Sequence, residues 1–146
     1  MCNMYSIKPG SSHAAARVLL VEDEPLIRLT MAEVLKDEGF AVVVAPDADA
    51  AWKLMQGDGF DLLLSDVHMP GRMTGQQLAR RAHIGDPDLP VVFVSGRADL
   101  VEPLGPHEVF FAKPYGLNRV IDAMRALLAE RAASAAPPRP GMLKPV

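Results

Sequence analysis

The feature that most constrains this chain is a regular alternation of short apolar runs with segments of helical periodicity. Runs this short and apolar are typical of strands buried on both faces of a parallel sheet. The five runs predicted to be strands are Val18–Val21, Phe40–Ala45, Leu62–Leu64, Pro90–Ser95 and Val109–Ala112. Strands that alternate with helices form βαβ units, so the sequence predicts an α/β fold with helices on both faces of the sheet.

Helix signals stand between these runs. Pro25 suits the first position of a helix, and apolar residues follow it at helical spacing up to Gly39 (Leu26, Leu29, Val34 and Leu35). Further helices are predicted from Asp47 to about Gln56, over Thr74–Ile84 and over Leu117–Arg131. Residues 97–107 contain Pro103, Gly105 and Pro106, so any helix in that stretch is expected to be short or irregular.

The chain is predicted to hold one domain over residues 17–131. Its 146 residues suit a single hydrophobic core. Residues 1–16 lack sustained periodicity and are predicted to form a flexible N-terminal arm. Residues 132–146 are rich in proline, too rich for a packed element, and are predicted to form a flexible tail.

Charge and composition limit the classes of partner that the protein is expected to bind. A net charge of -3 gives no basic field that would attract nucleic acid or an anionic membrane. No stretch reaches the about 18 apolar residues of a membrane helix. A single cysteine, Cys2, cannot form an internal disulfide and fits a reducing compartment. We therefore expect a cytoplasmic protein with neither nucleic acid nor membrane as partner.

Polar residues follow four of the predicted strands. Glu22 and Asp23 end the first strand, Asp66 ends the third, Ser95 the fourth, and Lys113 follows the fifth. Ligands of open parallel sheets bind beyond the carboxyl ends of the strands. Three carboxylates, one hydroxyl and one ammonium are therefore expected at one edge of the sheet. The alternative is that the strand-end acids serve only as helix caps and that the lysine is a surface charge. This alternative could hold for any one residue, but it explains all five at successive strand ends poorly.

This group of side chains predicts a specific chemistry. Three neighbouring carboxylates repel one another, and a hard cation with oxygen ligands compensates. Few carboxylates with water left on the ion suit Mg²⁺ better than Ca²⁺, and no Cys or His cluster suggests zinc. An aspartate such as Asp66 can form an acyl phosphate, while Lys113 and Ser95 can hold the phosphoryl oxygens.

At this point the residues resemble a known family. The segments VLLVEDEP, DLLLSDVHMPG, VVFVSG and FFAKPY are similar to those of bacterial response-regulator receivers, over about residues 17–131. The resemblance implies a flavodoxin-like, doubly wound, five-stranded parallel sheet with strand order 2-1-3-4-5 and a fourth helix that is short or irregular. It also implies a phosphoacceptor protein, with Mg²⁺-dependent self-phosphorylation and autodephosphorylation, and not an enzyme in the ordinary sense.

The resemblance also implies roles for the strand-end residues. Asp66 matches the phosphoacceptor, Asp23 the acid that binds Mg²⁺ directly, and Glu22 the acid that acts through water. Ser95 matches the switch hydroxyl and Lys113 the phosphate-binding lysine. Two backbone features complete the set: the carbonyl of His68 as a metal ligand and a cis bond between Lys113 and Pro114.

Some further positions are expected to tune the chemistry of the site, and others differ from the family pattern. Phe110 falls at the switch aromatic but lacks a hydroxyl, so a switch and plain core remain equal alternatives. The side chains of His68 and Arg97 are expected to flank the phosphoryl group and slow its hydrolysis. The loop Pro70–Gly75 is one residue longer than the common form, and the short stretch between Ser95 and Lys113 puts the usual output surface in doubt.

The implied function is that of a receiver in two-component signal transduction. Asp66 would take a phosphoryl group from a histidine kinase or a histidine phosphotransfer protein, and the protein would act on an unknown downstream protein or as a phosphorelay or sink. A receiver-fold binding module that works without phosphorylation is the main alternative. A dehalogenase-type phosphatase fits poorly, because His68 stands where that class has a second acid, and a flavin-binding protein fits poorly because no phosphate-binding loop follows the first strand.

Overall fold

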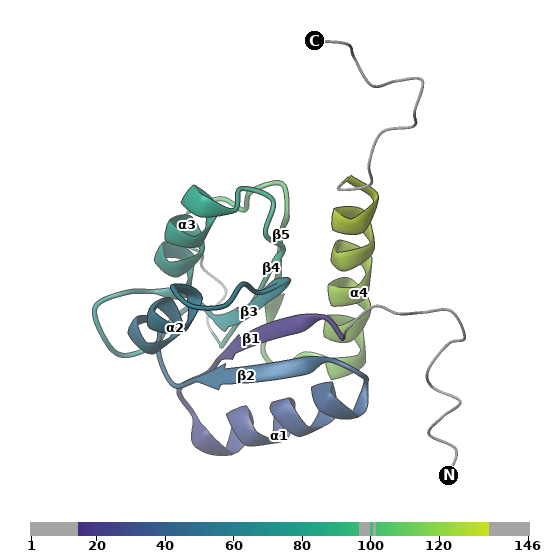
Figure 1. Ribbon diagram of the computed structural model, residues 1–146. Coiled ribbons are helices and arrows are strands. Elements are labelled where there is room, and N and C mark those ends of the chain that lie inside the picture. Colours follow the sequence, from purple (N-terminus) through teal and green to yellow (C-terminus); the bar gives the residue numbers. More distant parts are fainter. Residues whose placement is uncertain (1–14, 97–99, 101, 135–146) are drawn as a thin grey trace, which may run out of the picture.

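The computed structural model describes residues 15–96, 100 and 102–134. Its centre is a five-stranded parallel sheet in the order β2-β1-β3-β4-β5 (Figure 1). The strands are β1 (Arg17–Val21), β2 (Ala41–Ala45), β3 (Leu62–Asp66), β4 (Val91–Ser95) and β5 (Glu108–Ala112). The predicted doubly wound α/β fold and its strand order 2-1-3-4-5 are confirmed, with each strand end within one or two residues of its predicted position.

Four helices cover the sheet in the described part of the chain: α1 (Pro25–Asp37), α2 (Ala48–Met55), α3 (Gly75–Gly85) and α4 (Leu117–Ser134). Figure 1 shows α2 and α3 on one side of the sheet and α1 and α4 on the other. Between β4 and β5, none of the described residues is helical. The prediction of a reduced fourth helix therefore agrees with the structure, since two prolines and a glycine occupy this connection.

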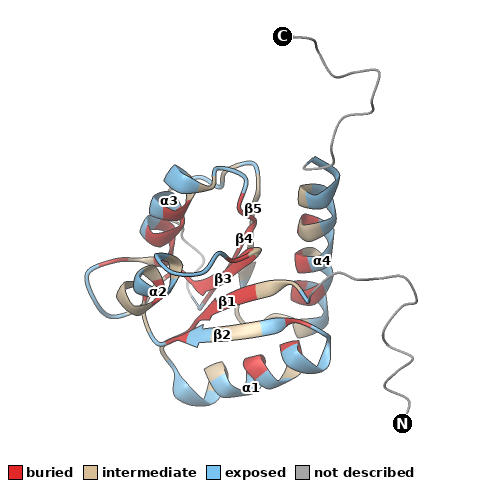
Figure 2. Cartoon of the chain, in the orientation of Figure 1, coloured by how far each residue is buried: buried red, intermediate tan, exposed pale blue. Residues whose placement is uncertain are grey.

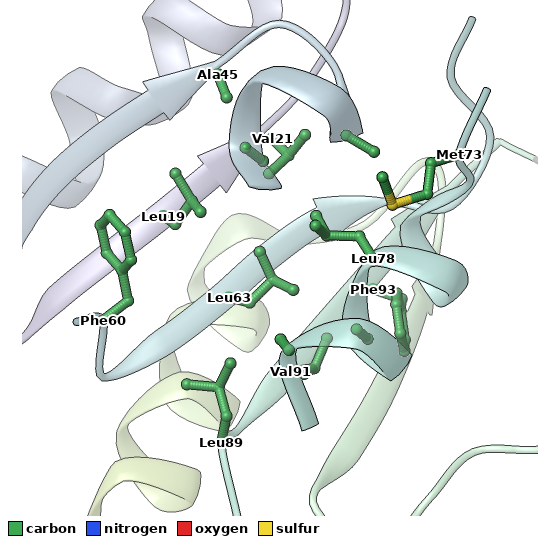
Figure 3. Packing of buried hydrophobic residues seen from close by; sticks show 14 of the residues in the cluster. Leu19, Val21, Ala45, Phe60, Leu63, Met73, Leu78, Leu89, Val91 and Phe93 are labelled. Atoms are coloured by element: carbon green, nitrogen blue, oxygen red, sulfur yellow. The ribbon is translucent and has the colours of Figure 1, made fainter. Parts of the chain in front are cut away.

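Two apolar clusters hold these layers together. The first lies between the sheet and helices α2 and α3, and Figure 3 shows Leu19, Leu63, Val91 and Phe93 of the sheet in the same cluster as Leu78 of α3. The second lies between the sheet and helices α1 and α4, with Leu20, Leu64, Met31 and Met124 among its members. Burial is most complete in β3 and β4, where all residues are buried (Figure 2).

Helix α1 is confirmed, but it buries only some of the apolar residues that indicated it. Leu26 and Leu29 are 72% and 60% exposed. The buried stripe of α1 instead consists of Met31, Ala32 and Leu35. At about 3.6 residues per turn, Leu26 lies on the opposite side of α1 from these three residues, and Leu29 lies at the margin of their face.

The turns at the helix ends follow their local sequence. Asp47 caps α2 by accepting a hydrogen bond from the backbone N–H of Ala50. Thr74 and Gln77 form a reciprocal capping box at the start of α3, the arrangement that satisfies two otherwise unpaired backbone groups. Among the described residues, no helix combines the length and apolarity needed to cross a membrane. The predicted N-terminal arm and C-terminal tail lie almost entirely outside the described residues.

Candidate functional site

The sheet brings the predicted site residues to one edge. Register pairs Val21 with Ser65, Asp66 with Val94, and Ser95 with Ala112. The residues that follow these positions, including the acidic pair after β1 and the lysine after β5, therefore leave the sheet at its carboxyl-terminal edge. This is the edge at which open parallel sheets bind ligands.

Three carboxylates gather at this edge. Glu22, Asp23 and Asp66 each offer an oxygen atom, and these atoms lie within 4.8 Å of one another. Glu22 is 1% exposed and Asp66 is 6% exposed, while Asp23 is half-buried. The protein thus holds an acidic pocket in which at least two charges are largely withdrawn from water.

Lys113 supplies the opposing charge. Its Nζ lies 3.2 Å from Asp66 Oδ2, to which it donates a hydrogen bond, and 3.5 Å from Glu22 Oε1. The lysine is positioned by its own backbone, because its N–H donates to the carbonyl of Ser95 at 2.7 Å. The ammonium therefore stands between the two buried acids rather than beside one of them.

The pKa values of the pocket reflect this crowding. Burial raises the pKa of Glu22, the charges of Asp66 and Asp23 raise it further, and the N–H of Glu24 and the ammonium of Lys113 offset only part of the rise. Burial by itself lowers the pKa of Lys113, but Asp66 and Glu22 outweigh that effect and the pKa is raised. The pocket therefore stabilises a positive charge and disfavours the state in which all three carboxylates are ionised.

The acids fit a small divalent cation. Glu22 Oε1 is buried and receives no hydrogen bond in the described structure, so one carboxylate oxygen has only the Lys113 ion pair to compensate its burial. Oxygen ligands from few carboxylates match the preference of Mg²⁺. Glu22, Asp23 and Asp66 are the side chains that would hold it, and bound Mg²⁺ would neutralise negative charge in the pocket.

Other predicted site residues lie around this pocket. Ser95 is 1% exposed at the end of β4, and the N–H of His68 donates to Asp66 Oδ1 at 3.3 Å. The His68 side chain is half-buried, with its Nε2 buried and without a hydrogen-bond partner. The Lys113–Pro114 bond is cis. Arg97 lies outside the described residues.

Phe110 lies on the face of β5 that packs with α2 and α3. It is half-buried, pairs in register with Phe93 and contacts the apolar cluster that includes Leu78 and Met73. Both readings of this residue, as switch aromatic and as plain core, are compatible with its packing.

Two supporting residues were missed by the sequence reasoning. The guanidinium Nη1 of Arg28 donates to the backbone carbonyl of Glu22 at 2.8 Å, which holds the turn after β1 against α1. Gly75 packs so tightly that an added Cβ would lie 2.1 Å from the carbonyl oxygen of Asp66. Arg28 carries no distinguishing signal in its sequence context, whereas a glycine at the first position of a helix signals a close backbone approach.

Comparison with known proteins identifies the family. Residues 18–125 match the response regulator receiver domain, so the chain belongs to that family. It is 32% identical over 116 residues to the response regulator receiver protein CpdR of Brucella abortus, with 77% of this chain and 96% of that protein covered. Some other curated relatives are longer, and the chain spans about a quarter of their length.

Solved structures agree in fold. A response regulator receiver protein from Sinorhizobium medicae has a TM-score of 0.76 and 30% identity, covering 80% of this chain and 97% of that one. The Thermotoga maritima response regulator TrrA, solved in complex with Mg²⁺ and BeF, has a TM-score of 0.69 at 24% identity, covering 77% and 98%. At that identity, the TrrA match supports the shared fold alone.

Family membership defines the class of protein. The chain is a receiver of two-component signalling, a phosphoacceptor rather than a classical enzyme. Its acidic pocket of Glu22, Asp23 and Asp66 is of the kind typical of a receiver magnesium site. A receiver implies a cognate histidine kinase.

Proposed function

We propose that Asp66 accepts a phosphoryl group from a phosphohistidine of a histidine kinase or a histidine phosphotransfer protein. The observation that carries this proposal is the position of Lys113, 3.2 Å from Asp66 and 3.5 Å from Glu22, in a pocket where three carboxylates converge. Mg²⁺ would bind through Glu22, Asp23, Asp66 and the backbone carbonyl of His68.

The transfer follows from the chemistry of the groups present. A carboxylate oxygen of Asp66 forms a bond to phosphorus while the bond from phosphorus to the donor's histidine nitrogen breaks, and that nitrogen keeps the electron pair. Lys113 exchanges its contact with the carboxylate for one with a phosphoryl oxygen, and the Ser95 hydroxyl donates to another. Mg²⁺, held by Glu22, Asp23 and Asp66, would neutralise negative charge during the transfer.

Phosphorylation changes the charge of the pocket, since a phosphoryl group carries about -1.5 to -2 at neutral pH. Movement of Ser95 toward the phosphoryl group would open space beside β5, and Phe110, half-buried on that strand, is placed to enter it. The outcome is a shift between two surface conformations. The protein would then bind a downstream protein, or pass the phosphoryl group on as a relay or sink.

The side chains of His68 and Arg97 would set the lifetime of the acyl phosphate. The backbone of His68 lies beside the acceptor, because its N–H donates to Asp66 Oδ1. A bulky imidazole at this position would shield phosphorus from water. Replacing either residue by alanine should speed the loss of phosphoryl label from purified protein. Rapid loss from the unsubstituted protein, unchanged by both substitutions, would contradict this role.

The direct test is phosphorylation by acetyl phosphate. The protein is incubated with Mg²⁺ and acetyl phosphate and weighed by intact mass spectrometry, alongside Asp66→Asn and a control, Asp58→Asn, which removes an acid whose side chain is 84% exposed. We expect one phosphoryl adduct on the unsubstituted protein and on the control, and none on Asp66→Asn. An adduct that survives in Asp66→Asn would place the acceptor elsewhere.

The alternative, a binding module that never takes phosphate, has a different signature. It predicts no adduct on any variant and no spectral change with Mg²⁺ and beryllofluoride. A complete loss of adduct formation in Lys113→Ala, with the fold retained by circular dichroism, would in contrast support the role proposed for the lysine.

A further inference from the structure

We propose that Arg28 is a positioning residue of the magnesium site, because its guanidinium holds the peptide group that joins Glu22 to Asp23. This role rests on the proposed function and deepens it, since it assigns the residue that orients one of the three pocket carboxylates. Arg28 is the fourth residue of α1 and contributes no ligand atom to the pocket. It would act on the ion only through the backbone of the two acids.

The connection between β1 and α1 is short. β1 ends at Val21 and α1 begins at Pro25, so only three residues carry the chain from the sheet into the helix (Figure 1). Two of these three residues are the acids Glu22 and Asp23. The direction in which each carboxylate points therefore depends on the backbone conformation of this connection.

Glu22 is held at each of its polar groups. Its N–H donates to the carbonyl of Ala45 at 3.1 Å, its Oε2 accepts from the N–H of Glu24 at 3.1 Å, and its Oε1 lies 3.5 Å from Lys113 Nζ. The remaining group is the backbone carbonyl, which accepts a hydrogen bond from Arg28 Nη1 at 2.8 Å. Arg28 thus completes the contacts that fix the position of Glu22.

Asp23 has no such contacts of its own. Its side chain is half-buried and makes no hydrogen bond or ion pair in the described part of the chain. The peptide group before it is planar and consists of the carbonyl of Glu22 and the N–H of Asp23. A hydrogen bond to that carbonyl therefore also orients the amide of Asp23, from whose Cα the carboxylate projects.

The guanidinium of Arg28 is directed at this carbonyl although another partner is close in sequence. Glu24 lies four residues before Arg28, the spacing at which a glutamate and an arginine pair on a helix surface. Among the described residues, however, the carbonyl of Glu22 is the one hydrogen-bond or ion-pair partner of the guanidinium. Hydrogen bonds from a charged donor are stronger than those from a neutral one, so this contact restrains the peptide group firmly.

Positioning and simple electrostatics predict opposite effects on Mg²⁺ binding. A guanidinium near a cation site repels the cation, so loss of its charge alone would tighten the binding of Mg²⁺. Loss of a group that orients metal ligands typically weakens metal binding, by about 10–100-fold. The sign of the change in affinity after removal of the guanidinium therefore distinguishes the two.

Two variants of Arg28 test the role directly. Arg28→Met removes the charge and the donors but keeps an unbranched side chain, whereas Arg28→Lys keeps the charge and a donor. Metal-free, full-length protein is titrated with MgCl₂ while the backbone amide signals of Asp23 and Val67 are followed by NMR. We expect the dissociation constant for Mg²⁺ to rise about tenfold in Arg28→Met and to return to within about threefold of the original value in Arg28→Lys.

Arg125→Met is the matched control. Arg125 lies on α4 and makes the same kind of contact at the other end of α1, where its Nη2 donates to the carbonyl of Glu38 at 3.0 Å. Its removal should lower the stability of the protein and leave the affinity for Mg²⁺ unchanged. Urea unfolding of both methionine variants in the presence of a chelator then separates a loss of stability from a loss of affinity.

Labelling by acetyl phosphate gives a second measurement. In Arg28→Met, the Mg²⁺ concentration that supports half of the maximal labelling rate should rise about tenfold, while the rate at saturating Mg²⁺ stays close to that of the unsubstituted protein. A general disturbance of the fold would instead lower the rate at every Mg²⁺ concentration.

The outcomes separate this role from the proposed function. An unchanged or lower dissociation constant in Arg28→Met would overturn the role of Arg28, and so would an equal rise in Arg125→Met. Mg²⁺ binding that depends on Arg28, in a protein that takes no phosphoryl group from acetyl phosphate, would support the role of Arg28 and contradict the proposed function. Failure of the unsubstituted protein to bind Mg²⁺ would overturn both.

Discussion

The buried carboxylate of Glu22 lowers the free energy of unfolding of the protein. Its carboxylate is 1% exposed, and one of its oxygens accepts the N–H of Glu24 at 3.1 Å while the other has only Lys113 at 3.5 Å. Burying a charge with so few partners opposes folding. Because the carboxylate has so few partners within the protein, it can bind a cation.

The raised pKa of Glu22 gives a prediction for stability against pH. A raised folded-state pKa means that the folded protein binds the proton more tightly than the unfolded chain. The stabilising effect is therefore complete below the ordinary pKa of 4.5 and is lost as the pH rises through the raised value. In metal-free buffer, Glu22→Gln should be more stable than the unsubstituted protein at pH 7, by about 1 kcal/mol.

The measurement is chemical unfolding of both proteins from pH 4.5 to pH 8 in the presence of a chelator. The advantage of Glu22→Gln should shrink toward the acid end, where Glu22 itself is protonated. Glu33→Gln, at an exposed position of α1, serves as the control and should show no such trend. A difference for Glu22→Gln that stays constant across the range would contradict the link to titration.

At the scale of an element, the start of α3 connects the pocket to the rest of the fold. Gly75 donates its N–H to the carbonyl of Val67 at 2.9 Å and packs against the backbone of Asp66. The next residue, Gln76, is 5% exposed. Its side-chain amide donates to the carbonyl of Glu102 at 2.8 Å and accepts from the N–H of the same residue at 3.2 Å. One turn of helix thus touches both the proposed acceptor and the connection between β4 and β5.

Gly75→Ala should be strongly destabilising. A Cβ there would lie 2.1 Å from the Asp66 carbonyl oxygen and 2.9 Å from Ser65 Oγ, and backbone cannot move away as a flexible side chain would. We expect a loss of about 3 kcal/mol in the free energy of unfolding and reduced labelling by acetyl phosphate.

Gly85→Ala is the matched control, because it lies at the other end of the same helix with nothing within 4 Å of the added Cβ. It should be neutral or slightly stabilising, since alanine favours helix over glycine. Equal losses for the two substitutions, measured by urea unfolding, would show that the close approach at Gly75 is relieved in solution.

Gln76→Ala should loosen the connection between β4 and β5. The substitution removes both hydrogen bonds to the backbone of Glu102, which should cost about 2 kcal/mol and speed amide hydrogen exchange at Glu102. Gln56→Ala, at an exposed position after α2, should change stability by less than about 0.5 kcal/mol. Unaltered exchange at Glu102 in Gln76→Ala would mean that other contacts hold this segment.

At the scale of the whole molecule, the sequence predicted the layers better than the contacts between them. Alternating apolar runs identified the parallel sheet, and strand ends located Glu22, Asp66 and Lys113 at one edge, because a parallel sheet gathers such ends by construction. Solvent exposure of Leu26 and the contact of Arg28 were not predictable, since each depends on how α1 rotates against the sheet.

Because the acids of the pocket come from β1 and β3, which pair directly, ion binding should stabilise the entire domain. A ligand that binds only the folded state adds about 2.7 kcal/mol at a hundred times its dissociation constant. At that concentration of Mg²⁺ we expect the melting temperature to rise by about 5–10 °C. In Asp23→Asn the rise should largely disappear, because one of the three carboxylates is gone.

The comparison must be made within each variant, with and without Mg²⁺, since removing an acid from a crowded pocket relieves repulsion and changes the metal-free stability by itself. Asp58→Asn removes an acid outside the pocket and should keep the full rise. A rise of the same size in Asp23→Asn would mean that Mg²⁺ stabilises the protein from somewhere other than the pocket. A rise confined to proteins with all three carboxylates would tie the stability of the domain to the site where Asp66 is proposed to accept its phosphoryl group.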